Sequence, residues 1–363
     1  MNASADVGLL LRGLHEPLRI DEGRWDRLLR LGRVSGLHAR LAATNLDNPA
    51  LTAVVRRHLL SAQRMAAYRT QMLRAELFRL APLVTDDFPV IVLKGAAYVL
   101  QQRRLSVGRF VSDVDLLVPR PQLRTMESRL LDAGWRAEKL EAYDERYYRD
   151  WSHETPPMRY PGSTLELDLH HALTPVTGSL AFDPASLFAR SEAIPGTPFR
   201  ALCAEDQVLH ACVHCFHDGE LDLRLREVVD IDGLLRAFAE APGFSARLRQ
   251  RAAELGLERP LWYGLHFAEA WLGCLPAHEL KASLPPPGAL ARRSMDALVP
   301  LSMLPSDPDF PPPMRVAIAR TLLRSRYQWL RMPPHLLFPH LLRKSWRRLR
   351  ARADANGQAD GMP

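Results

Sequence analysis

The sequence has few cysteines and no long apolar run. Its 363 residues include only Cys203, Cys212, Cys215 and Cys274, whose spacing fits neither a disulfide framework nor a zinc ribbon. Free thiols in a reducing compartment are the simplest interpretation. The apolar runs are too short to span a bilayer, and the early VGLLL segment lacks the length and basic flank of a secretion signal. Together these absences predict a cytoplasmic protein.

The bulk composition is that of an ordinary globular protein. Apolar residues make up 47% of the chain and charged residues 25%, so a folded core is expected. The length allows two or three domains. The net charge of +7 is compatible with an anionic ligand such as a nucleotide, but it does not require nucleic acid.

The spacing of apolar residues changes twice along the chain. Apolar residues recur at helical spacing up to about residue 82 and again from Glu205 onward. Between these regions lie short β-branched runs with Gly and Pro at their ends. We therefore expect an N-terminal helical region (1–85), a central domain with a sheet (86–200), a C-terminal helical domain (201–350) and a disordered tail (351–363).

The central region predicts a specific order of elements. A buried strand in FPVIVL precedes a helix in KGAAYVLQQ, and a second strand in FVSDVDLLV follows a loop. Pro121 suits the first turn of the next helix, and Gly134 suits its end. A third strand is expected over residues 135–140. The segment 155–173 reads as a hairpin that turns at PGS.

Two acidic residues stand inside the second strand. Asp113 and Asp115 are two positions apart, so their carboxylates emerge on one face of the strand. Such close like charges repel unless a cation neutralises them, and a hard divalent ion with oxygen ligands would do so. In the LELDLH run, Asp168 can supply a third carboxylate, with Glu166 as the second candidate and His170 on the same face. The pattern predicts a magnesium site with one or two ions.

The turn before this strand has matching chemistry. Lys94 and Gly95 follow a strand and open a helix, where backbone N–H groups favour an anion and a small residue lets phosphate approach. Lys94 adds a point charge, and Arg109 offers a fork of donors. We expect these three residues to bind the phosphates of a nucleotide.

At these residues the chain resembles the nucleotidyltransferase superfamily with the polymerase β-type palm. The closer similarity is to a large bacterial nucleotidyltransferase family with the pattern LKG … R … DIDLLV … LH. Here that pattern reads VLKGAAYVL, Arg109, SDVDLLVPR and LDLHHAL. The run CAEDQVLHACVHCFHDGELDLRLREVVDIDGLL is similar to the helical C-terminal part of the same family, so the likeness covers roughly residues 20–240.

The resemblance implies an α+β fold, with a polymerase β-like palm of a small mixed sheet and flanking helices between N- and C-terminal helical regions. It implies that Asp113, Asp115 and Asp168 hold Mg²⁺, that Asp168 assists deprotonation of the acceptor, and that Lys94 and Gly95 lie by the phosphates. The implied activity is transfer of an NMP group from an NTP, ATP in the first instance, to a hydroxyl or phosphate acceptor whose identity the sequence does not reveal.

Other interpretations stay open. The turn reads Lys94-Gly95-Ala96 where the superfamily has Gly-Gly or Gly-Ser, so the alternative is a catalytically inactive nucleotide-binding or partner-binding scaffold. The acidic residues would also suit a solvated edge strand. In that case Arg109 forms a plain salt bridge with Asp113. A mainly helical protein with an incidental DVD strand is the third alternative.

Two further features invite hypotheses. His210, His214 and His217 share one helix face, which suggests zinc or, more readily, either packed histidines or histidines that face a nucleotide cleft; His214 is a secondary site candidate. The basic segment 341–352 suits weak contact with an anionic membrane or nucleic acid, or a solvated helix end.

Overall fold

The structure is a computed structural model, and it describes residues 3–138, 141–178, 180, 183–217, 220–337 and 339. The basic segment 341–352 and the predicted tail lie outside these residues. None of the helices among the described residues has the length and apolar character that a membrane span requires.

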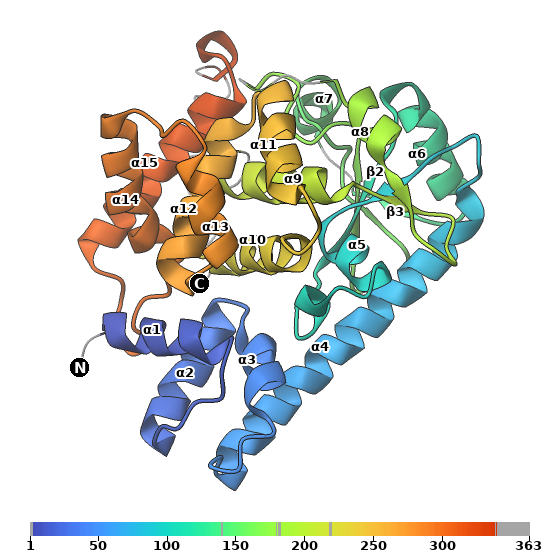
Figure 1. Cartoon of the computed structure of the whole chain (residues 1–363). Coiled ribbons are helices and arrows are strands. Elements are labelled where there is room, and N and C mark those ends of the chain that lie inside the picture. The colour runs from blue at the N-terminus through green and yellow to red at the C-terminus, as the bar shows by residue number, and fades with distance from the viewer. Residues whose placement is uncertain are drawn as a thin grey trace, which may run out of the picture.

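Four helices form the N-terminal region, as the periodicity predicts: α1 (Ala3–Gly13), α2 (Glu22–Val34), α3 (His38–Asn45) and α4 (Ala53–Leu80). The caps follow from the sequence, because the Asp21 side chain accepts a hydrogen bond from Arg24 N at 3.0 Å and Thr52 caps α4 in the same way. Trp25, Leu28 and Leu59 pack in a separate apolar cluster here. Figure 1 shows α4 running from these helices to the sheet.

A seven-stranded mixed sheet lies in the centre of the described chain, in the order β3-β4-β5-β2-β1-β7-β6. The β2–β5 and β1–β7 pairs are parallel, and the other pairs are antiparallel. The strands are short: β1 (Ile91–Val92), β2 (Asp113–Leu117), β3 (Arg136–Ala137), β4 (Met158–Arg159), β5 (Glu166–His170), β6 (Glu192–Ala193) and β7 (Arg200–Ala201). Short helices alternate with them: η1 (Ala81–Leu83), α5 (Lys94–Leu100), η2 (Arg104–Ser106), η3 (Arg120–Gln122), α6 (Leu123–Asp132), α7 (Ala142–Asp150) and α8 (Ala185–Arg190).

The two faces of the sheet differ because strand residues alternate. Val114 and Leu167 belong to the main core, which also takes Leu73 from α4 and Met126 from α6. The opposite face carries the acidic residues. The predicted hairpin is confirmed, since β4 pairs antiparallel with β5 and Gly162 adopts a φ of 82° in the turn between them.

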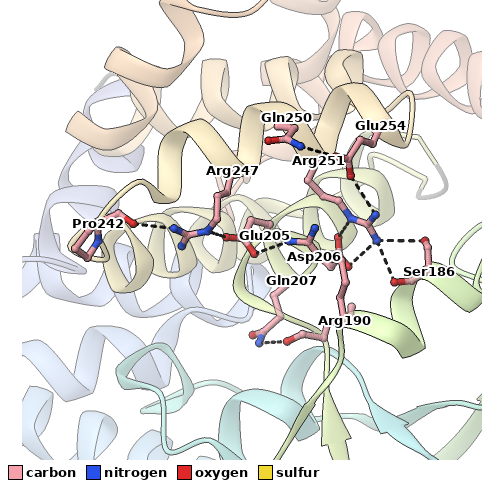
Figure 2. A network of polar contacts seen from close by, with 11 residues as sticks. Ser186, Arg190, Glu205, Asp206, Gln207, Pro242, Arg247, Gln250, Arg251 and Glu254 are labelled. Carbon is pink, nitrogen blue, oxygen red and sulfur yellow. Dashed lines mark hydrogen bonds and ion pairs between the residues drawn. The ribbon is translucent and has the colours of Figure 1, made fainter.

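Helices form the rest of the described chain: α9 (Ala204–Phe216), α10 (Leu225–Phe238), α11 (Phe244–Glu254), α12 (Glu258–Leu272), α13 (Leu275–Ala282), α14 (Ala289–Met303) and α15 (Met314–Arg331). A polar network fixes the first turn of α9 to α11 (Figure 2). Arg251 donates from Nε to Asp206 Oδ1 at 2.7 Å, and Arg247 donates to Glu205 Oε1 at 2.7 Å. Because Asp206 is 1% exposed, this ion pair holds α9 against α11 away from solvent.

The predicted fold class is confirmed: the chain is α+β, with a small mixed sheet and flanking helices between helical N- and C-terminal regions.

Candidate active site

Three carboxylates lie on one face of the sheet where β2 and β5 run side by side. Asp115 is the register partner of Asp168, and Asp113 is the partner of Glu166. In a parallel pair, register partners point to the same face, so Asp113, Asp115 and Asp168 share one face of the sheet. The backbone alternation that predicted a common face thus holds across both strands.

Asp115 is buried and already has two cationic partners. Lys94 donates from Nζ to Asp115 Oδ1 at 2.7 Å, and His170 Nε2 lies 3.0 Å from the same oxygen. Burial alone would raise the pKa of Asp115, but the Lys94 ammonium and His170 outweigh burial and hold that pKa well below its usual range. Asp115 therefore stays ionised near neutral pH.

The backbone explains why Lys94 reaches Asp115. Leu93 N donates to Asp115 O at 3.0 Å, so the end of β1 lies beside the middle of β2. Lys94 then adopts a φ of 45°, a left-handed conformation that is rare for a residue with a side chain. Burial opposes the charge on Lys94, but Asp115 and Asp113 outweigh it and raise the pKa of the amine.

Asp168 has the opposite electrostatic environment. Burial and the nearby carboxylates of Asp115 and Glu154 raise its pKa to about 7. The neighbouring Asp115 and Asp168 therefore differ in protonation. The ionised Asp115 is suited to stabilise positive charge, and Asp168 is suited to exchange a proton.

The second candidate for the third carboxylate, Glu166, shares this face but has a partner of its own. Glu166 has a side chain that is 50% exposed and forms an ion pair with Arg159 on β4. Asp168, directly opposite Asp115, is the carboxylate that the structure brings to the cluster.

Arg109, which the sequence predicts as a phosphate-binding residue, has buried partners within the chain. It is buried, donates from Nε to Asp230 Oδ2 at 2.9 Å, and its guanidinium lies 5.6 Å from the centre of the Tyr98 ring. Arg40 from α3 forms an ion pair with the same Asp230. The alternative of an Arg109–Asp113 salt bridge is not what the structure shows either, because Asp230 on α10 takes that place.

Gly95 has a packing role in this arrangement. A Cβ atom at Gly95 would lie 2.3 Å from Arg109 Nη1, so a glycine is needed where the guanidinium passes beneath the turn. The helix that follows, α5, has only seven residues.

The sequence did not point to His153 and Glu154, which come from the segment before β4. Glu154 forms a β-bridge with His170, and His171 N donates to His153 O at 2.8 Å. Potential ligand atoms of His153, Glu154 and His170 lie within 4.8 Å of one another, and both imidazoles have Nε2 3.8 Å from Glu154 Oε2. Two nitrogens and one carboxylate suit Zn²⁺ or Mn²⁺ better than Mg²⁺. His170 was visible in the LDLHH run, but its neighbours Glu154 and His153, which come 16 and 17 residues earlier, were not.

Two histidines of α9, His210 and His214, lie close enough to Lys94 to feel its charge. Burial and then the Lys94 charge lower the pKa of His210 to about 3, and the same two causes lower the pKa of His214. Both imidazoles are therefore neutral neighbours of the cluster, and His214 Nε2 lies 2.7 Å from Arg224 Nη2. In the described part of the chain, no α9 histidine belongs to a group with metal-ligand geometry. Burial also raises the thiol pKa of Cys212 and Cys215.

A small mixed sheet with paired aspartates on one strand and a third on its parallel neighbour is the arrangement expected of a nucleotidyltransferase. The chain belongs to this class: the model of the family described as "Uncharacterised nucleotidyltransferase" matches residues 21–273. No curated protein matches the chain significantly. The crystal structure of an antigenic nucleotidyltransferase-like protein from Paracoccidioides brasiliensis is similar over 58% of this chain and 92% of that chain, with 14% identity and a TM-score of 0.29. That likeness is too weak to support an argument.

Proposed function

We propose that the protein is a magnesium-dependent nucleotidyltransferase that moves an NMP group from an NTP, ATP in the first instance, to a hydroxyl or phosphate acceptor. The observation that carries this proposal is the Asp115–Asp168 pairing across β2 and β5, with Asp113 on the same face. In the reaction, the acceptor oxygen forms a bond to the α-phosphorus, the bond to pyrophosphate breaks, and the acceptor proton leaves.

The residues fit a divalent cation. Asp113, Asp115 and Asp168 offer hard oxygen ligands, and the mutual repulsion that contributes to the raised pKa of Asp168 is what a bound cation would relieve. When bound, Mg²⁺ would supply charge neutralisation at the phosphates. Asp168, ionised once a bound cation relieves that repulsion, is suited to accept the acceptor proton. Lys94 would exchange its contact with Asp115 for the triphosphate.

The test uses two readouts. Wild-type protein should bind ATP with Mg²⁺ and release pyrophosphate with an acceptor from a screen of sugars, nucleotides and proteins. Asp115→Asn should lose both Mg²⁺-dependent binding and release, whereas Asp132→Asn, on the exposed end of α6, should keep both. Full turnover by Asp115→Asn would refute the assignment.

A second candidate is a catalytically inactive nucleotide-binding scaffold. The contact between Lys94 and Asp115 favours it, because the ammonium already neutralises a carboxylate that a cation would otherwise use. Mg²⁺-dependent ATP binding by calorimetry, without pyrophosphate release across the whole acceptor screen, would select this function over transfer.

A further inference from the structure

A small cavity lies among the C-terminal helices, lined by a different set of residues from the carboxylate cluster. Its volume is about 190 Å³, and its walls come from the end of α9, the first turn of α12 and the last turns of α15. Leu180, Phe216 and Leu330 form apolar parts of the wall. The space is large enough for a phosphate group and too small for a nucleotide.

Two buried polar atoms in the wall of this cavity have no hydrogen-bond partner among the described residues. They are the hydroxyl of Tyr263, a residue that is 1% exposed, and Nε2 of His217, which is 8% exposed. Buried polar groups in folded proteins are nearly always paired. An unpaired hydroxyl and imidazole at one cavity therefore indicate a polar occupant.

The same cavity has an excess of positive charge. Arg326 from α15 donates from Nη1 to Phe216 O at 2.9 Å, and Arg259 from α12 lines the opposite part. Neither guanidinium forms an ion pair within the described part of the chain. Burial, together with the charge of Arg259, lowers the pKa of Arg326 to about 10 although Tyr263 opposes this, so the guanidinium stays charged at neutral pH.

The N-terminus of helix α12 adds to the positive potential of the cavity. The 15-residue helix α12 begins at Glu258 with no side-chain cap, and the cavity is lined by Arg259 and Pro260 from its first turn and by Gly256 just before it. The positive end of a helix dipole favours an anion at this position.

We propose that this cavity binds a phosphate group, held by the guanidinium groups of Arg326 and Arg259 and by hydrogen bonds from the Tyr263 hydroxyl and His217 Nε2. At neutral pH His217 is an uncharged imidazole, because burial and the two arginines lower its pKa to about 4, and the neutral ring donates one N–H. The site is independent of the proposed nucleotidyl transfer, since it shares no residue with the carboxylate cluster.

The probe is inorganic phosphate, titrated into the full chain by calorimetry at constant ionic strength with chloride as the reference anion. Wild type should bind phosphate, and Arg326→Gln should weaken binding at least tenfold. Arg259→Gln, at an exposed position, should weaken it as well and serves if Arg326→Gln fails to fold. Arg324→Gln is the matched control, because Arg324 lies on the same helix with an exposed ion pair to Glu220.

Two further arms distinguish the sources of phosphate. Glycerol phosphate that binds as tightly as inorganic phosphate would show that the site takes the terminal group of an organic molecule; weaker binding would show a site for the free ion. Binding that both arginine variants keep would belong to another site and would overturn the proposal, as would no binding in wild type at about 10 mM phosphate.

Discussion

Lys94 Nζ lies 2.7 Å from Asp115 Oδ1, so the lysine of the strand-to-helix turn binds the carboxylate that is central to the acidic face. The two residues come from β1's end and from β2, and both are largely buried, with side chains 17% and 3% exposed. This contact gives Asp115 a cationic partner from the chain itself.

Replacing Lys94 by Met would leave Asp115 with the hydrogen-bond contact to His170. Loss of one member of a buried ion pair costs about 3 kcal/mol, so the unfolding free energy in urea should fall by that amount. Millimolar Mg²⁺ should restore part of the loss, because the cation then replaces the ammonium. Lys281→Met, at a more exposed pair with Glu269, should change the unfolding free energy by less than about 1 kcal/mol and show no Mg²⁺ response.

Asp168 predicts a pH dependence of stability. Its folded-state pKa of about 7 lies above its ordinary value of 3.8, so between these values the folded state holds a proton that the unfolded chain releases. The unfolding free energy of wild type should therefore decrease relative to Asp168→Asn as the pH rises from about 4 to 7, by about 2 kcal/mol after allowance for solvent screening. A constant difference between the two proteins across this range would contradict the assigned protonation.

Gly95→Ala tests the packing beneath the turn. The added Cβ would meet Arg109 Nη1 at 2.3 Å, and that guanidinium cannot withdraw because Asp230 holds it. Overpacking of this kind costs about 1–3 kcal/mol, measurable by urea unfolding. Gly8→Ala is the control: nothing lies within 4 Å of its Cβ on the exposed side of α1, so stability should rise by about 0.5–1 kcal/mol.

Asp230→Ala should be strongly destabilising. The variant leaves Arg40 and Arg109 as two buried guanidinium groups without their shared carboxylate, and loss of such a partner costs about 3–5 kcal/mol. Calorimetric unfolding should show a large drop in Tm. Asp26→Ala, which removes an exposed pair with Arg30, should cost less than about 1 kcal/mol. Equal decreases in the unfolding free energy of both variants would contradict a larger contribution from the buried Arg40–Asp230–Arg109 triad.

Local sequence pattern was enough to predict much of the site. The two-residue spacing of Asp113 and Asp115 places them on one face of any strand, and the alternation in LELDLH does the same for Asp168. The helical periodicity, the turn at Gly162 and the helix end at Gly134 likewise depend on neighbours in the chain, and the structure has each of them.

Only the tertiary structure decided which charges meet. Arg109 pairs with Asp230, which follows it by 121 residues, and not with Asp113. Glu154 reaches His170 through a bridge that no periodicity indicates. The physical reason is that a side chain's direction follows from local backbone geometry, whereas its partner depends on strand register and helix packing between distant segments. The sequence by itself therefore determined the acidic face, and the packing determined that Lys94 and His170 neutralise it.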